Sequence, residues 1–198
     1  MKLLYYTLAF FIMSLSYSQN DPLKELPYSS IPDYPEEYTP GSVVARMIDG
    51  LGFRYYWATN GLTSDDLIYK PSEDGRSLDE TLDHIYGLSS MIYQSAIKEA
   101  NDRTSALNIP STFKEKRQAT LINLKKASEI FLLSNDLKSH PIIFKSNKGT
   151  SESPFWHQIN GPIEDAVWHS GQIVIMRRAA GNPIDPNVNF FRGIRTSE

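Results

Sequence analysis

The sequence of 198 residues contains no cysteine. Disulfide bonds, thiolate nucleophiles and cysteine-based zinc sites are therefore excluded, and so is lipid attachment at a mature N-terminal cysteine. The sequence also lacks a glycine-rich phosphate-binding loop and the Gly-x-Ser-x-Gly motif of a serine nucleophile. No motif therefore points to catalysis by a cysteine of the chain, to nucleotide-phosphate binding or to serine-hydrolase chemistry.

An excess of positive charge and strand-like alternation are missing as well. The formal charge is −3 and the pI is near 5.8. No basic stripe is visible, so nucleic acid is not an expected partner. No segment alternates apolar and polar residues in the manner of a half-buried strand. With 40% apolar residues the chain can form a real core, and its length suits one domain.

Residues 1–18 have the features of a signal peptide. Lys2 supplies the positive charge, residues 3–15 form an apolar run, and Ser16 and Ser18 are small residues suited to cleavage before Gln19. The run is too short and wrongly flanked for a membrane span; a retained membrane anchor is the alternative. We expect export, to the periplasm or the cell exterior, and no membrane contact after cleavage.

We expect the two ends of the mature chain to be extended segments. Residues 19–40 are rich in proline, which prevents a helix. They should form an arm that lies against the helices through Tyr28, Tyr34 and Tyr38. Residues 182–198 follow Gly181, contain further prolines and should form an extended tail that packs on the helices through its apolar residues.

Between these ends, apolar residues recur at helical spacing in four segments. We expect helices near residues 42–60, 77–101, 112–135 and 161–181. Four amphipathic helices without strands predict an all-α four-helix bundle over residues 41–181.

Local signals accompany the predicted helices. Ser77 and Glu80 form a capping box, in which each satisfies a free N–H group of the other. Gly50 and Gly52 should weaken the first helix or let another helix approach closely. On the third helix, Lys116 and the neighbouring lysines are expected on a solvated face.

The last segment, GPIEDAVWHSGQIVIMRRAAG at 161–181, carries the clearest chemistry. Pro162 suits the first turn and could mark a kink with Gly161, and Gly181 suits the position after the end. Asp165 and His169 are four residues apart, so their side chains share one face. A carboxylate and an imidazole one turn apart can hold a metal ion, with a third ligand from elsewhere. A plain surface contact is the alternative.

Other polar residues have open roles. His84 lies at the edge of the apolar face of the second helix, where structural histidines are common. His157 is a reserve ligand, and Glu164 is another alternative to Asp165. His140 precedes a proline in a loop, and we expect no metal role for it.

Two residues of the last helix are weak catalytic candidates. Gln172 could orient a ligand or a bound water, although a plain polar helix position is the alternative. Arg177 could hold a substrate carboxylate or act as a cation at a helix end.

The chain from 43 to 183 resembles the DinB-like (DinB/YfiT) superfamily of metal-binding four-helix bundles. The resemblance rests on SLDETLDHI at 77–85 and DAVWHSGQI at 165–173, followed by Arg177 and Gly181. In that family a metal lies between the second and fourth helices, held by one His from the second and an H-x-x-x-H pair from the fourth. The resemblance therefore implies His84, Asp165 and His169 as ligands. The family's usual residue at the place of Asp165 is His; a branch that looks similar, with mycothiol-dependent maleylpyruvate isomerase, has Glu.

Two function classes follow. A divalent ion would activate water or polarise a bound oxygen or thiol; zinc is the default, with nickel, manganese or iron as alternatives. We expect a metal-dependent hydrolase or a thiol-type transferase, although export disfavours the transferase because small-molecule thiols are chiefly cytoplasmic. The alternative is a non-catalytic binding or structural bundle with a vestigial site. A small-molecule substrate is the expected partner, Tyr55, Trp156 and Trp168 are candidate pocket walls, and a homodimer is left open.

Overall fold

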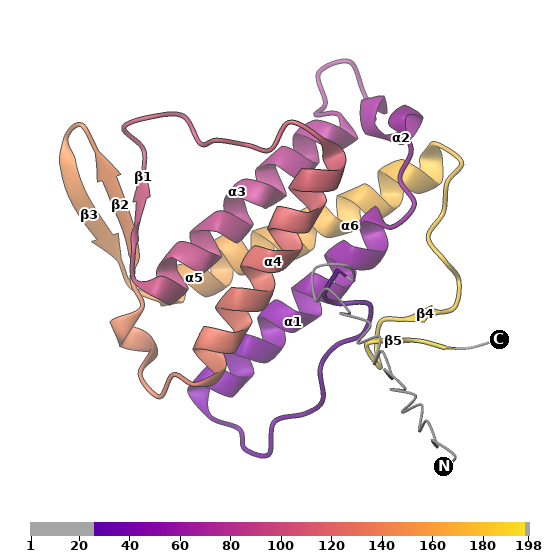
Figure 1. Ribbon diagram of the computed structural model, residues 1–198. Helices are drawn as coiled ribbons and strands as arrows, with labels where there is room; N and C mark the ends of the chain where they lie inside the picture. Colours follow the sequence, from indigo (N-terminus) through magenta and orange to yellow (C-terminus); the bar gives the residue numbers. More distant parts are fainter. Residues whose placement is uncertain (1–25, 197–198) are drawn as a thin grey trace, which may run out of the picture.

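The computed structural model describes residues 26–196, so the predicted signal peptide lies outside the described residues. Four long helices dominate the fold (Figure 1): α1 (Pro40–Thr59), α3 (Leu78–Ile97), α4 (Phe113–Leu132) and α6 (Glu164–Ala179). Helix α1 packs against α4 and α6, and α3 packs against the same two helices. The helices predicted to share a metal, α3 and α6, are therefore neighbours.

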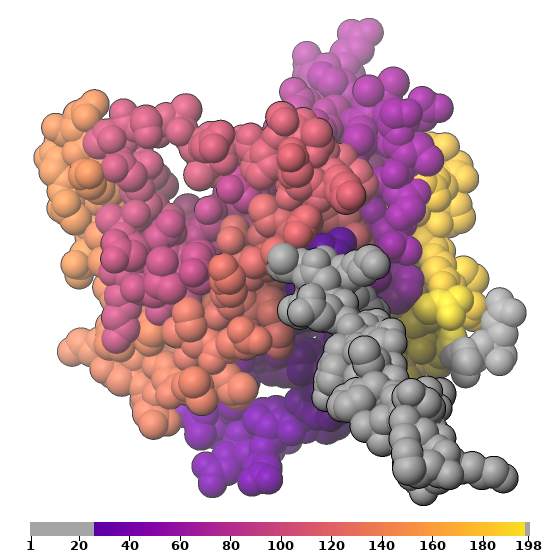
Figure 2. Space-filling model, in the orientation of Figure 1, coloured from indigo at the N-terminus to yellow at the C-terminus, as the bar shows by residue number. Residues whose placement is uncertain are grey.

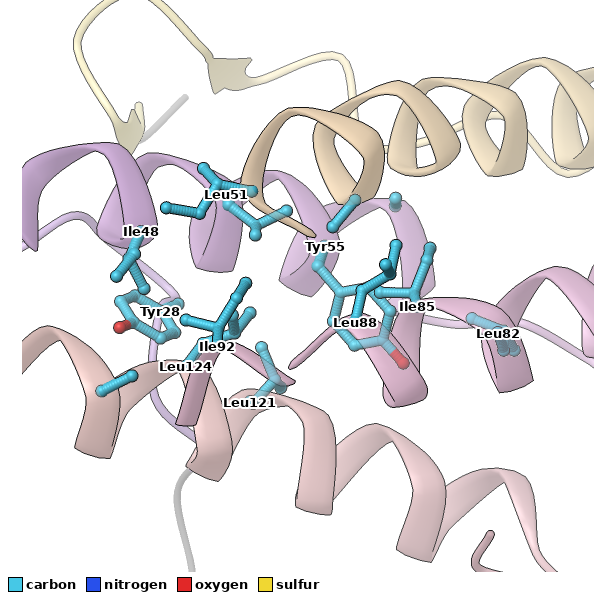
Figure 3. Close-up of a cluster of buried hydrophobic side chains, with 14 of the residues drawn as sticks. Tyr28, Ile48, Leu51, Tyr55, Leu82, Ile85, Leu88, Ile92, Leu121 and Leu124 are labelled. Carbon is cyan, nitrogen blue, oxygen red and sulfur yellow. The ribbon is translucent and has the colours of Figure 1, made fainter. Parts of the chain in front are cut away.

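The core lies where the apolar faces of these helices meet (Figure 3). Its members are fully or almost fully buried, and each large aliphatic side chain contributes about 1.5–3 kcal/mol when removed from water. Those labelled in the figure include Ile48, Leu51, Tyr55, Leu82, Ile85, Ile92, Leu121 and Leu124. The helical periodicity of the sequence is confirmed by this shared interior.

The chain is helix-rich as predicted, but the expectation of a domain without strands is wrong. Strands β1 (Ala100–Asp102), β2 (Ile142–Ser146) and β3 (Gly149–Ser153) form a small sheet in that order. Strand β1 pairs with β2 in parallel, and β2 pairs with β3 as an antiparallel hairpin. These strands are too short to show a clear alternation, and β1 is fixed by a partner some forty residues away.

Several predicted helix ends differ from the structure, by up to four residues. Helix α3 stops at Ile97 because Lys98 adopts the left-handed conformation, with φ 62° and ψ 32°, and the chain then enters β1. Helix α4 stops at Leu132, three residues earlier than expected. The predicted loop after α1 contains the short helix α2 (Ser64–Ile68), and η1 (Leu137–Ser139) follows α4.

The last helix is reached through an irregular turn. The short helix α5 (Trp156–Gln158) leads into the π-helical segment η2 (Ile159–Ile163), and α6 follows. Gly161 has φ −94° and ψ −106°, outside the helical region. The predicted kink at Gly161-Pro162 is therefore confirmed.

The capping box of α3 is confirmed as well. The Ser77 hydroxyl accepts from the Glu80 N–H at 3.1 Å, and the Glu80 carboxylate accepts from the Ser77 N–H at 2.6 Å. This pair defines where α3 begins, six residues before His84.

The N-terminal arm lies against α1, and its one buried tyrosine is Tyr28. Tyr28 is buried among α1 and the core (Figure 3). Its hydroxyl donates to Asp49 at 2.9 Å. Its ring lies over Gly52, so this glycine makes room for the arm. The suggestion that Gly52 lets another helix approach is therefore wrong. Tyr34 is 81% exposed but contacts α1, where the Arg46 guanidinium lies 4.8 Å from its ring centroid. Tyr38 is 96% exposed, so the expected anchoring applies to Tyr28 and, at the surface, to Tyr34.

The C-terminal tail packs on α1 as predicted. Phe190 meets Phe53 edge to face with ring centroids 5.7 Å apart. The tail is not wholly extended, since β4 (Val188–Asn189) and β5 (Ile194–Arg195) form a small hairpin. The Ile31 N–H donates to the Gly193 carbonyl at 2.8 Å, so arm and tail are joined. Within residues 26–196 no helix has the length and apolar character needed to cross a membrane.

Candidate metal centre

His84 is presented by the second turn of α3. Leu82 and Ile85 beside it are completely buried, so this part of α3 is fixed against the core. The His84 side chain is 33% exposed. It therefore lies at the border between the core and solvent, where a ligand can be both oriented and accessible.

Asp165 and His169 follow the π-helical segment. A π-turn changes the helical register, so the residues after η2 are rotated relative to those of α5. Ile163, Ala166 and Ser170 then face the interior and are almost fully buried. With that face fixed, Asp165 and His169 are brought to the side of α6 next to α3.

The three predicted ligands meet. Asp165 Oδ2 lies 3.1 Å from His84 Nε2, and Asp165 Oδ1 lies 3.3 Å from His169 Nε2. One ligand atom from each residue lies within 4.8 Å of the others, and the group could hold a metal ion. The two imidazole rings are 4.5 Å apart and nearly perpendicular, at 84°. Among the described residues, no other group of His, Asp and Glu meets in this way.

Gln172 is the fourth member of the site. Its Oε1 lies 2.8 Å from His169 Nδ1, so the Nδ1–H donates to the amide oxygen. This hydrogen bond leaves Nε2 as the nitrogen that faces Asp165, and it fixes the orientation of the ring. The sequence suggested that Gln172 orients a ligand, and the structure brings it to His169.

Arg177 is not at the site. It is 2% exposed, and its guanidinium donates to the carbonyls of Trp57, Ala58 and Asn60 at the end of α1. It also donates to the carbonyl and side-chain oxygens of Asn182. The substrate-binding role suggested for Arg177 is therefore replaced by its alternative, a cation at a helix end.

The reserve ligands are not part of the group. His157 and Glu164 are exposed side chains outside the cluster. His140 is buried, with Nε2 3.0 Å from the Ser134 hydroxyl and Nδ1 3.1 Å from the Ala96 carbonyl. It links α3 to the segment after α4, which fits the expectation that it has no metal role.

The suggested pocket walls are also elsewhere. Trp156 and Trp168 are 76% and 72% exposed, and Tyr55 is completely buried in the core. None of the three lines a pocket that includes His84 or His169.

Two hollows adjoin the site, one lined by His84 and the other by His169, whereas Asp165 lines neither. The first, which we call the α3 pocket, measures 640 Å³ and has His84 in its wall. It lies between α3 and residues 100–109, which comprise β1 and the loop after it; Figure 2 shows the opening beneath this segment. The second, the α6 pocket, measures 430 Å³ and includes His169 and Gln172. The site thus stands at the border of two hollows, each large enough for a small molecule.

Lys116 is a residue whose role the sequence did not reveal. It is only 3% exposed and not on a solvated face, so that expectation was wrong. Its ammonium lies 2.7 Å from Asp79 and also pairs with Asp83, beside His84. Because the lysine comes from α4 and both acids from α3, the pairing fixes α3 near the site. The sequence signal for this burial was that Lys116 lies on the same helical face as the apolar residues of α4.

Comparison with known proteins identifies no relative: no family model matches the chain, and neither a curated protein nor a solved structure matches it significantly.

Proposed function

We propose that His84, Asp165 and His169 bind one divalent metal ion between α3 and α6. The observation that carries this proposal is the surroundings of His169. Both of its ring nitrogens face oxygen atoms, Nδ1 that of Gln172 and Nε2 that of Asp165. A neutral imidazole has only one N–H. When Nδ1 carries that N–H, Nε2 has a lone pair that faces the negative carboxylate of Asp165. A cation between Nε2 and the carboxylate would attract both and stabilise this contact.

The arrangement is the one in which proteins hold a metal-binding histidine. The nitrogen remote from the metal donates to an oxygen acceptor, which orients the ring and raises its basicity. Two imidazoles and one carboxylate suit zinc best, and nickel, manganese or iron also accept such ligands. The partial exposure of His84 and Asp165 leaves room for water or a substrate on the outer side.

A bound ion would supply a Lewis acid that activates water or polarises a bound oxygen or thiol. The protein's own contribution is to hold the three ligands and to orient His169 through Gln172. On this basis we propose a metal-dependent hydrolase or transferase, with the hydrolase favoured by the proposed export.

We further propose that the chain is an exported DinB-like four-helix bundle. Two features support this assignment. The four long helices follow one another in the expected order, and the cluster joins the second and the fourth of them.

A non-catalytic bundle with a vestigial site is the second candidate. One observation favours it. Asp165 already contacts both imidazoles at 3.1 and 3.3 Å, so an additional proton on His169 could replace the cation and keep the group together. Binding of the metal decides between the two.

The test is calorimetric titration of zinc into metal-free mature protein beginning at Gln19. We expect one ion per chain. His169→Ala should abolish binding yet keep the helical circular dichroism spectrum, because alanine is the best helix former. Asp165→His should keep or tighten binding. His157→Ala is the matched control and should bind as the wild type does. If the wild-type protein takes up no ion, the second candidate is correct.

A further inference from the structure

The α6 pocket has walls of two kinds. Pro71, Ile175 and Met176 form its apolar part. Its polar part comprises His169, Gln172, Thr81 and Arg76. It therefore offers an apolar surface and polar groups directly beside one of the proposed ligands.

Two side chains of this pocket keep uncommitted donors, Gln172 and Arg76, whereas Thr81 has already used its only hydrogen. The Thr81 hydroxyl donates to the Ser77 carbonyl at 2.9 Å. Gln172 uses its oxygen on His169, which leaves its NH₂ group. Arg76 makes no hydrogen bond or ion pair with a residue in the range 26–196, and no Asp or Glu lines the pocket. Glu80 already accepts a hydrogen bond from the Ser77 N–H and pairs with Lys70. Hydrogen bonds from Ser77 lower the pKa of Glu80 most, and the charges of Lys70 and Arg76 lower it further.

A pocket with free donors, one cation and no acid is suited to an anion with acceptor oxygens. The planar fork of an arginine matches a carboxylate with two parallel hydrogen bonds. The apolar walls favour a hydrocarbon part next to that group. His169 belongs to the same wall, so a molecule bound in this pocket would lie beside one of the proposed ligands.

The α3 pocket differs in charge. Its walls contain Asp83, Asp102 and Arg103. The Thr104 hydroxyl and N–H donate to Asp102, and Lys145 pairs with it, which lowers the pKa of this carboxyl group to about 2. It is ionised at neutral pH, so the walls of this pocket, unlike those of the α6 pocket, carry acidic side chains.

We propose that the α6 pocket binds a small organic acid, with its carboxylate on Arg76 and its apolar part against Ile175 and Met176. This inference rests on the proposed metal function and adds the class of substrate. A substrate with a carboxylate at one end and the reacting group at the other would fit.

The test uses mature protein loaded with cobalt, whose visible spectrum changes when a thiolate binds the ion. Mercaptopropionate and mercaptopropanol are the probes, since they differ only in the charged end. We expect the acid to bind about tenfold tighter or more, the effect of one charge-assisted contact. Arg76→Gln should remove this preference and leave the affinity for the neutral thiol unchanged. Arg178→Gln, another exposed arginine but outside the pocket, should keep the preference.

Each result separates this inference from the proposed function. If the protein binds no metal in the zinc titration, the proposed function itself is wrong. If cobalt binds but the two thiols bind equally, or Arg76→Gln keeps the preference, the acid-binding role of this pocket is wrong and the metal site stands. A cobalt spectrum unaffected by either thiol also overturns the inference, since the pocket then gives no access to the ion.

Discussion

Gln172 holds His169 through a single 2.8 Å hydrogen bond to Nδ1, and this contact can be tested by itself. Gln172→Ala should weaken zinc binding about 10- to 100-fold, because a ring without its outer partner loses orientation and basicity. The measurement is the calorimetric Kd of zinc.

The control for this substitution is Gln118→Ala on α4, a helix that carries no site residue. It should leave the Kd unchanged. An unchanged Kd for Gln172→Ala would mean that packing alone orients the ring.

Two arginines show how residue-level prediction failed. Arg177 has the right sequence distance from His169 to meet a substrate, yet its guanidinium is buried at the end of α1. Burial lowers its pKa from the usual value, while the Asp66 charge acts in the opposite direction. Arg76, in a loop without any motif, lines the pocket beside His169. A residue's position along the chain does not give the direction of a side chain relative to a distant helix.

At the scale of elements, we expect alanine substitutions at two glycines of α1 to change the stability of the protein in opposite directions. A Cβ on Gly52 would lie 2.4 Å from the Tyr28 ring, whereas a Cβ on Gly50 would meet only the flexible tip of Arg54 at 3.4 Å. Gly52→Ala should therefore destabilise the protein by about 1–3 kcal/mol, the usual cost of overpacking. Gly50→Ala should stabilise it by about 0.5–1 kcal/mol, because alanine favours the helix.

Urea unfolding of the two variants measures both effects. Both variants replace glycine by alanine in the same helix, so helix propensity alone would raise the urea midpoint of both. A higher midpoint for Gly52→Ala would mean that the Tyr28 ring does not pack against Gly52.

At the scale of the whole molecule, the proposed ion links two of the four long helices. A ligand that binds only the folded state stabilises it by about 2.7 kcal/mol when its free concentration is 100 times Kd. Zinc should therefore raise the urea midpoint of the wild-type protein and leave that of His169→Ala unchanged.

Magnesium is the control ion for this experiment. It prefers oxygen ligands in octahedral geometry and should have no effect on the wild-type midpoint. Equal stabilisation of the wild type and His169→Ala by zinc would place the binding elsewhere in the chain.

The sequence by itself determined the local features. The four long helices, the Ser77–Glu80 capping box and the kink at Gly161 depend on neighbours within a few residues. For the same reason Asp165 and His169 were predicted to share a face, since that requires only an intact turn of α6. The role of His84 came from a resemblance to a family, and no spacing could give it, because His84 and Asp165 are far apart in the sequence.

Only the tertiary structure decided the contacts between distant segments. Strand β1 exists because β2 pairs with it, Lys116 is buried because two acids of α3 receive it, and Tyr28 enters the core because Gly52 leaves space. The same holds for the choice between Arg177 and Arg76. The directions of these side chains are set by the packing of helices against one another, and that packing depends on the shape of the whole core and not on any one segment.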